Sequence, residues 1–179
     1  MIKGEIYTIQ DIGMRILLIQ KDGLDLYATL VASETSRIIL RFYRPERVSC
    51  GVLITTASLG SALSLASELR WYIRRYMREV LFEIHPAVYC THTLAEEVYQ
   101  RDAHLEMPWP ARCLYGFKEG RLAIRQPLDA TEGKSIEDEA LSGMDHVIEV
   151  WSHPSEPAER EEVDEETMEE PQPGDYQSE

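Results

Sequence analysis

The chain has 179 residues and a formal net charge of −14, and this length accommodates one ordinary domain. No apolar run approaches the roughly 20 residues of a membrane-spanning helix, and the first residues lack the pattern of a signal peptide. The three cysteines form no CxxC pair, which favours reduced thiols. These features argue against membrane and disulfide-rich secreted proteins and indicate a cytoplasmic one.

The charge is unevenly divided along the chain. Residues 129–179 contain 18 acidic and two basic residues, whereas residues 1–128 contain 14 acidic and 16 basic ones. A segment so rich in charge buries too little apolar surface to offset the roughly 1–2 kcal/mol of entropy lost for each ordered residue. We therefore expect a folded domain at 1–128 and a disordered acidic tail at 129–179.

The first predicted strand of the domain is Met14–Gln20, an apolar run closed by a turn. Residues 1–13 before it are expected to form a loose N-terminal extension, unless Met14 is the true start. Residues 25–33 fit either a strand or a helix.

A helix is predicted for residues 33–44. Ser33 can cap its start, Ile38, Ile39 and Phe42 share a face, and Pro45 ends it.

The best strand in the sequence is Val48–Thr56, which is rich in β-branched residues. Ser58 then caps a predicted long helix that continues to Tyr76. Its apolar residues recur at i, i+3, i+4 and i+7, so one face packs on the sheet. They are Leu59, Ala62, Leu63, Ala66, Leu69, Ile73 and Tyr76.

The last predicted elements are a strand at 79–84, a helix at 92–102 and a β-hairpin at 112–126 that turns at Lys118-Glu119-Gly120. Strands that alternate with helices favour a parallel sheet. We therefore predict an α/β fold with a mainly parallel sheet of four to five strands, helices on it, a C-terminal β-hairpin and the disordered tail.

The start of the long helix is a candidate anion site formed by Ser58, Gly60 and Ser61, because the amide groups of a helix N-terminus attract anions. The segment lacks the glycine pattern of a P-loop or a dinucleotide-binding turn. The favoured interpretation is that these residues are small so that the helix can pack closely against its neighbours.

A stripe of arginines follows on the same predicted helix: Arg70, Arg74, Arg75 and Arg78. These side chains could bind nucleic-acid phosphates while the nearby aromatic rings stack on bases. The favoured interpretation is that they complement the helix dipole and pair with acidic neighbours, because the body has a net charge of only +2.

The acidic tail contains one apolar island at 145–151, formed by Val147, Ile148, Val150 and Trp151. Such an island either folds onto a protein partner or packs on its own domain as an added edge strand. The sequence leaves both alternatives open.

No catalytic residue, metal ligand or cofactor site is predicted. His85, Cys90 and His92 lie close together in the sequence, but their spacing matches no recognised metal motif or nucleophile–base pair.

Residues 55–76, together with the preceding strand and the stretches ASETSR and LYGFKEGRL, resemble a small euryarchaeal protein family of unknown function over residues 14–125. The resemblance implies an archaeal, cytoplasmic, single-domain protein and transfers no activity or site residue.

The sequence as a whole favours a non-enzymatic interaction or adaptor module with an unidentified protein partner, and no membrane contact. One alternative is a small enzyme or anion-binding domain that uses the helix start at Ser58. A second alternative is a nucleic-acid-binding regulator that acts through the arginine stripe.

Overall fold

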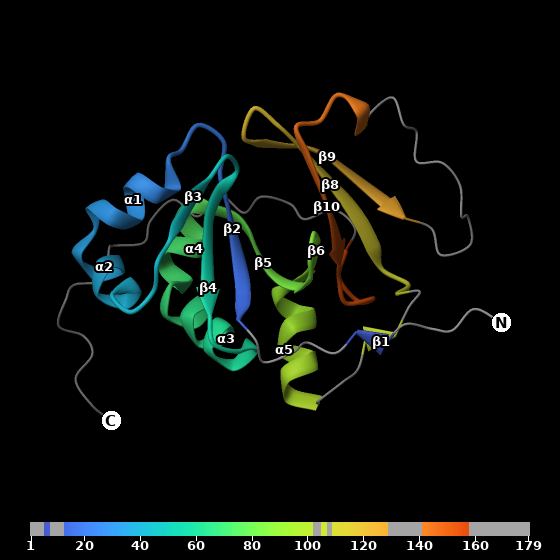
Figure 1. Cartoon of the computed structure of the whole chain (residues 1–179), viewed down its shortest axis with the longest axis horizontal. Helices are drawn as coiled ribbons and strands as arrows, with labels where there is room; N and C mark the ends of the chain where they lie inside the picture. Colours follow the sequence, from blue (N-terminus) through green and yellow to red (C-terminus); the bar gives the residue numbers. More distant parts are fainter. Residues whose placement is uncertain (1–5, 8–12, 102–104, 107–108, 129–140, 158–179) are drawn as a thin grey trace.

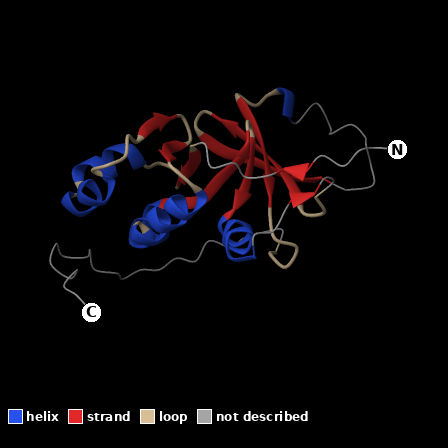
Figure 2. Ribbon diagram, turned by 60° about the horizontal axis from the view of Figure 1, so that its bottom comes forward, coloured by secondary structure: helices blue, strands red, loops and turns tan. Residues whose placement is uncertain are grey.

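The computed structural model describes residues 6–7, 13–101, 105–106, 109–128 and 141–157. Within them, a mixed eight-stranded sheet carries helices on one side (Figures 1 and 2). The strand order is β3 (Glu46–Val48), β4 (Gly51–Thr56), β2 (Met14–Gln20), β5 (Met77–His85), β6 (Val88–Thr91), β10 (His146–Trp151), β8 (Arg112–Lys118) and β9 (Arg121–Leu128). The helices are α1 (Leu26–Ala32), α2 (Glu34–Leu40), α3 (Leu59–Glu68), α4 (Arg70–Tyr76) and α5 (His92–Arg101). Two short strands, β1 (Ile6–Tyr7) and β7 (Leu105–Glu106), pair separately.

The prediction of a mainly parallel sheet of four to five strands is wrong. Of the neighbouring pairs in the large sheet, only β6 and β10 run parallel, and the others are antiparallel. The sheet is also wider than expected, because the hairpins β3–β4 and β5–β6 add strands and β10 inserts from the C-terminal segment. The predicted C-terminal hairpin is present as β8 and β9, which turn at Glu119 and Gly120.

Both unrecognised hairpins depend on tight turns. The run Val48–Thr56, expected to be one strand, is divided because the chain reverses at Ser49 and Cys50. Gly51 follows this reversal with φ of 152°, and a Cβ there would lie 1.9 Å from the carbonyl oxygen of Leu18. Only glycine fits such a close approach between strands.

The second hairpin joins β5 to β6 through Pro86 and Ala87, and Ala87 adopts a φ of 64°. Non-glycine residues are uncommon in this left-handed region, so the sequence gives a weak signal for this turn.

The predicted long helix is two helices. The chain bends at Leu69 (φ −85°, ψ 4°), which ends α3 and begins α4. Helix α4 then passes directly into β5 at Met77. Arg78, expected on the helix, therefore lies on a strand.

The apolar island of the C-terminal segment forms β10, between β6 and β8 in the interior of the sheet. The sequence predicted that the ordered part of the chain ends at residue 128, but residues 141–157 continue the fold. Strand β10 contains one acidic residue, Glu149, and no lysine or arginine, but an average over the whole acidic segment hides this short apolar stretch.

Two apolar cores lie on opposite faces of the sheet. The larger core packs the helices against one face and includes Ile16, Ile54 and Phe82. The smaller core joins Leu17 and Ile19 of β2 to residues of β8 and β10. Strand β2 is not a neighbour of β8 or β10 in the sheet, so the sheet must curl to bring their side chains together. The smaller core is therefore enclosed by the sheet itself, without helices.

None of the helices in the described residues is both long enough and apolar enough to cross a membrane.

Candidate functional site

Helix α2 buries two small polar side chains and exposes a large apolar one. Its buried residues include Thr35 and Ser36, whereas Ile38 on the same helix is 48% exposed. Phe42, one helical turn beyond Ile38, is 80% exposed. The predicted common helical face of Ile38, Ile39 and Phe42 is wrong, because α2 ends at Leu40, before Phe42, and Ile39 packs against the larger core. Ile38 and Phe42 are exposed to solvent, whereas the small polar residues point inward.

The exposed apolar side chains concentrate in this region. Among the described residues, four large hydrophobic side chains are exposed, and three of them are Val31, Ile38 and Phe42. Val31 lies at the end of α1, which packs against α2. Burying a side chain of this kind contributes about 1.5–3 kcal/mol. In the isolated chain these side chains remain exposed, so a partner that covers them would gain this free energy on binding.

Three arginines accompany these apolar side chains: Arg37, Arg41 and Arg44 are all exposed. None of the three forms an ion pair within the described residues. The guanidinium of Arg41 lies 4.5 Å from the centre of the Phe42 ring. We call Val31, Arg37, Ile38, Arg41, Phe42 and Arg44 the α2 surface.

Hydrogen bonds and an ion pair hold helices α1 and α2, which carry the α2 surface, in place. The side chain of Asp25 accepts the amide hydrogen of Ala28 at the start of α1 and pairs with Arg47 at 2.5 Å. These two contacts, the backbone hydrogen bond first, lower the pKa of Asp25. At the junction between α1 and α2, the Ser33 hydroxyl lies 2.6 Å from the Tyr72 hydroxyl of α4. The helices below the surface are thus tied to the main domain.

Underneath α2, the Ser36 hydroxyl donates to the carbonyl of Leu30. Leu26, Leu30 and Leu40 join the larger core. A small Ser or Thr side chain lets two short helices approach closely, and this explains why Thr35 and Ser36 lie on the inner side of α2 beside the buried Leu40.

The predicted anion site at the start of α3 is occupied by its own side chains. The Ser58 oxygen accepts the amide hydrogen of Ser61 at 3.2 Å, and the two hydroxyl groups lie 3.1 Å apart. Gly60 faces the ring of Tyr99 on α5, and a Cβ there would lie 3.0 Å from the ring. Close packing between α3 and α5 accounts for the small residue at this position.

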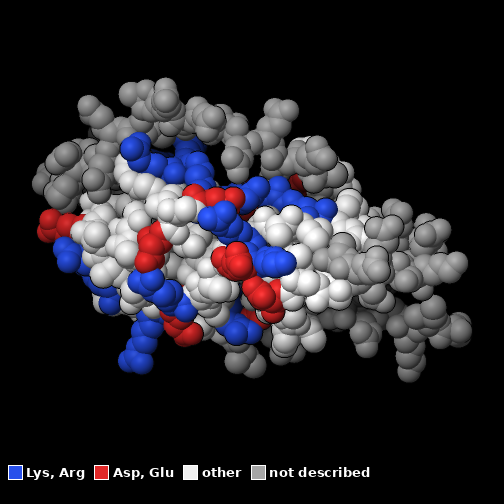
Figure 3. Space-filling view, turned by 90° about the horizontal axis from the view of Figure 1, so that it is seen from above, with Lys and Arg blue, Asp and Glu red and all other residues white. Residues whose placement is uncertain are grey.

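The four arginines of the predicted stripe do not form one helical row. Arg70, Arg74 and Arg75 lie on α4, and Arg78 lies on β5, 3.7 Å from Asp22. Arg75 lies near the rings of Trp71 and Tyr76. Figure 3 shows basic and acidic side chains interspersed on one face of the molecule rather than gathered in a continuous basic track.

The island residues pack on their own domain. Ile148, Val150 and Trp151 are buried in the two cores, and Val147 is half-buried. Trp151 stacks on Trp109 at 6.1 Å and donates its indole N–H to Glu149 at 2.6 Å. In this fold the island contacts β6 and β8 instead of presenting itself to a partner.

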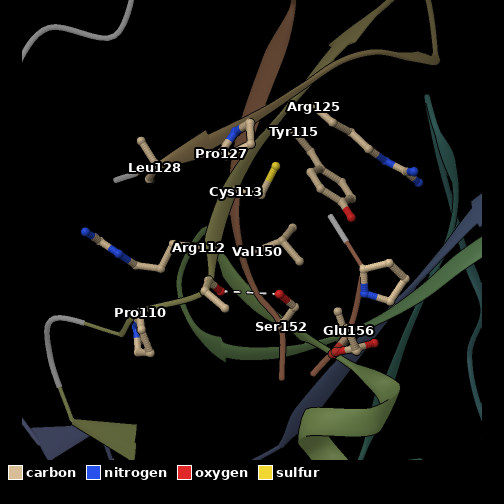
Figure 4. Close-up of a pocket in the computed structure, with 13 residues that line it drawn as sticks. Pro110, Arg112, Cys113, Tyr115, Arg125, Pro127, Leu128, Val150, Ser152 and Glu156 are labelled. Atoms are coloured by element: carbon tan, nitrogen blue, oxygen red, sulfur yellow. Dashed lines mark hydrogen bonds between the residues drawn. The ribbon is translucent and has the colours of Figure 1, made fainter. Parts of the chain in front are cut away.

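A pocket of about 190 Å³ lies where β8, β9 and β10 approach the segment after β10 (Figure 4). Cys113, Tyr115 and Val150 line its inner wall, and Glu156 lies at its side. Glu156 accepts the hydroxyl hydrogen of Thr91 at 2.6 Å. The side chains of Arg112 and Arg125 extend away from the middle of the pocket in opposite directions.

Behind the pocket, the fully buried carboxylate of Glu79 holds the curled sheet together. It accepts the Tyr115 hydroxyl hydrogen at 2.9 Å and lies 3.0 Å from a guanidinium nitrogen of Arg125. Strand β5 is thereby joined to β8 and β9 across the smaller core. This group of three residues was not found from the sequence, because its members lie far apart along the chain.

Burial affects the thiol and the phenol of the pocket most strongly. Burial raises the pKa of the Cys113 thiol to about 11, and the nearby Arg125 lowers it only in part. Burial and then the charge of Glu79 raise the pKa of Tyr115 well above its ordinary value. The thiol and the phenol therefore keep their protons near pH 7, the phenol donates its hydrogen to Glu79, and neither of these two groups is an activated nucleophile.

The cluster of His85, Cys90 and His92 does not assemble. Cys90 is fully buried, and burial raises the pKa of its thiol. His92 lies 3.7 Å from Glu96 on the same helix. No group of three or more possible metal ligands converges within the part of the chain that the structure describes.

A family of unknown function, DUF5804, matches residues 14–109, which is more than half of the chain. No curated protein and no solved structure matches the chain. The matched region contains the whole α2 surface, whereas most residues that line the pocket follow residue 109.

Proposed function

The chain belongs to the family of unknown function DUF5804, and we propose that it is a protein-interaction module that binds acidic peptide segments at the α2 surface. The observation that carries this proposal is the exposure of Ile38 on α2 and of Phe42 just after it, while Thr35 and Ser36 lie inside. A non-enzymatic role of this kind requires no activated residue.

The chemistry of the α2 surface determines the kind of partner. Aromatic residues and arginines are enriched in binding hot spots, because they combine large contact area with directed polar contacts. Three arginines that form no ion pair with any described residue, next to apolar side chains, complement a segment in which Asp or Glu alternates with large apolar residues. Nucleic acid is less suitable, because Ile38 and Phe42 would lie against phosphates.

We place the protein in the cytoplasm and regard an archaeal origin as part of this proposal. The reduced state expected of three unpaired cysteines supports the first point. The resemblance described above supports the second.

A binding titration tests the proposal. The probe is a fluorescein-labelled peptide of about 20 residues, mainly Glu, with Phe, Leu or Met at every fourth position. We expect fluorescence anisotropy to show saturable binding to the full chain, and Ile38→Ser or Phe42→Ser to weaken it about tenfold, equivalent to about 1.4 kcal/mol. Arg37→Ser combined with Arg41→Ser should weaken binding and reduce its dependence on salt.

Tyr99→Ser is the matched control, because Tyr99 is also a large exposed side chain (60%) but lies on α5, away from the three arginines. It should leave the affinity unchanged. A loss as large as that of Phe42→Ser would show unspecific apolar binding and would contradict the proposal.

The two alternative functions predict other binding and stability results. A labelled single-stranded oligonucleotide that binds more tightly than the peptide, with sensitivity to Arg70, Arg74 and Arg75, would favour a nucleic-acid regulator. A small anion that stabilises the chain and loses this effect in Ser58→Ala would favour a ligand site at the start of α3. Either result without peptide binding would overturn our proposal.

A further inference from the structure

We infer that the C-terminal segment of the chain, residues 158–179, binds the α2 surface in cis and competes with the partner. This inference rests on the proposed function, because it concerns the same surface. It assigns a regulatory role to a segment that is otherwise explained only by solubility.

The amino-acid composition of residues 158–179 complements the basic and apolar side chains of the α2 surface. It contains ten acidic residues and one basic residue, a net charge of −9 within 22 residues. Val163, Met168 and Tyr176 are spaced among the acids. The segment thus has the same pattern, acids interspersed with large apolar side chains, that the α2 surface favours in a partner.

The positive charge of the α2 surface and its surroundings supports binding of the acidic segment. Arg37, Arg41 and Arg44 of the α2 surface form no ion pair within the described residues. Arg70 and Arg74 on α4, the helix joined to the α1–α2 junction through Tyr72, are exposed as well. Exposed arginines attract a strongly acidic segment most effectively when it belongs to the same molecule.

The segment is long enough to reach the surface from its point of attachment. It begins after Pro157, and a 22-residue chain can span up to about 70 Å. A domain of this size is about 40 Å across, so no part of its surface is out of range. A tether of this length gives an effective concentration on the order of 1 mM.

This effective concentration sets the size of the effect. If the segment binds with an intrinsic dissociation constant of about 0.1 mM, roughly nine molecules in ten are occupied in cis. The apparent affinity for a partner peptide then falls about tenfold.

Cross-linking in the full chain tests the contact directly. A carbodiimide couples carboxylates to lysine amines, and the α2 surface contains no lysine. Arg37→Lys supplies an amine there without changing the charge. We expect mass spectrometry to find cross-links between position 37 and acidic residues of 158–179, at a yield that is independent of protein concentration and lost in about 1 M salt.

Arg121→Lys is the matched control, because Arg121 is an exposed arginine on β9. It should yield few cross-links to the segment. Equal cross-linking at positions 37 and 121, or cross-links that form only between two chains, would overturn the inference.

A second measurement uses the labelled peptide of the preceding section. The ten acidic residues of 158–179 are replaced by Asn and Gln in the full chain, and the affinity should rise about tenfold. Replacement of Glu132, Glu137, Asp138 and Glu139, which lie outside the segment, should change it less than twofold.

The two proposals fail in different ways. If the peptide does not bind even to the chain with the neutral segment, the proposed function is wrong. If the peptide binds this variant and the unaltered chain equally and no cross-links form at position 37, the competition in cis is wrong and the proposed function stands.

Discussion

Glu79 is the residue whose removal should have the clearest energetic effect. Its buried carboxylate satisfies both Tyr115 and Arg125. We expect Glu79→Gln to lower the free energy of unfolding by about 2 kcal/mol, because Arg125 loses its charged partner while Tyr115 keeps an acceptor. Urea denaturation followed by circular dichroism measures this change.

The control for this substitution is Glu96→Gln. Glu96 is half-exposed and lies 3.7 Å from His92, and we expect a change within about 0.5 kcal/mol. Similar losses in both variants would show that the buried position of Glu79 confers no special stability.

Stability should decrease at alkaline pH. Burial is the main cause that raises the pKa of five acidic groups: Cys50, Cys90, Cys113, Tyr89 and Tyr115. The folded chain therefore retains protons that the unfolded chain releases above pH 9.0 for cysteine and 10.0 for tyrosine. The free energy of unfolding should fall as pH rises through this range, because deprotonation favours the unfolded chain.

Urea titrations between pH 7 and 11 test this expectation. Cys113→Ser removes the group whose pKa is about 11 and should make the decline less steep. A constant or rising stability above pH 9 would show that the thiols and phenols are accessible to water in the folded chain.

At the α2 surface, the sequence identifies the residues but not their orientation. A spacing of four predicts Ile38 and Phe42 on one face of a helix, but α2 ends at Leu40, before Phe42. Which face is covered depends on the neighbours of the helix. Leu30 and Tyr72 fit against Ser33 and Ser36, and no local pattern signals this contact.

Among the elements, two turns offer a controlled comparison of backbone strain and steric fit. Gly23 and Gly120 have almost the same φ, 77° and 76°. Nothing lies within 4 Å of a Cβ at Gly23, whereas a Cβ at Gly120 would lie 2.4 Å from the carbonyl oxygen of Ser49. The tip of the β8–β9 hairpin therefore touches the turn between β3 and β4.

We expect Gly23→Ala to cost about 1 kcal/mol, the cost of a left-handed residue that is not glycine. Gly120→Ala should cost at least about 2 kcal/mol more, because the hairpin tip must move away from Ser49 and the sheet must open. Urea denaturation of both variants measures the difference. Equal costs would mean that the contact between the two turns contributes nothing to the curled sheet.

The positions of most elements could be predicted from the sequence, but their directions could not. The apolar run at Met14–Gln20 and the turn at Glu119-Gly120 are local signals, and both appear in the structure. The direction of a strand depends on how the chain reaches it, because a hairpin before the strand reverses the direction of the chain. The turns at Ser49-Cys50 and Pro86-Ala87 reverse the chain within a few residues and convert the expected parallel sheet into an antiparallel one.

For the whole molecule, charge gives a misleading domain boundary. The segment after residue 128 is strongly acidic on average, yet it supplies the strand that joins the β5–β6 part of the sheet to the β8–β9 hairpin. Without β10, the hairpin would have no neighbour in the sheet. The unit of folding therefore extends at least to Trp151.

Substitution of Trp151 tests this view of the molecule. Trp151 is buried in the larger core and stacks on Trp109. We expect Trp151→Ala to lower the free energy of unfolding by about 3–5 kcal/mol, because it leaves a large cavity at the centre of the sheet. Circular dichroism in urea should show a single transition at a lower urea concentration, since β10 unfolds together with the domain.

Val147→Ala is the comparison, because Val147 lies on the same strand but is only half-buried. It should cost about 1 kcal/mol or less. If β10 were an appendage to a domain that ends at residue 128, Trp151→Ala would leave the main transition unchanged. In that case the C-terminal hairpin would need another support, and the curled sheet with its second core would not describe the protein in solution.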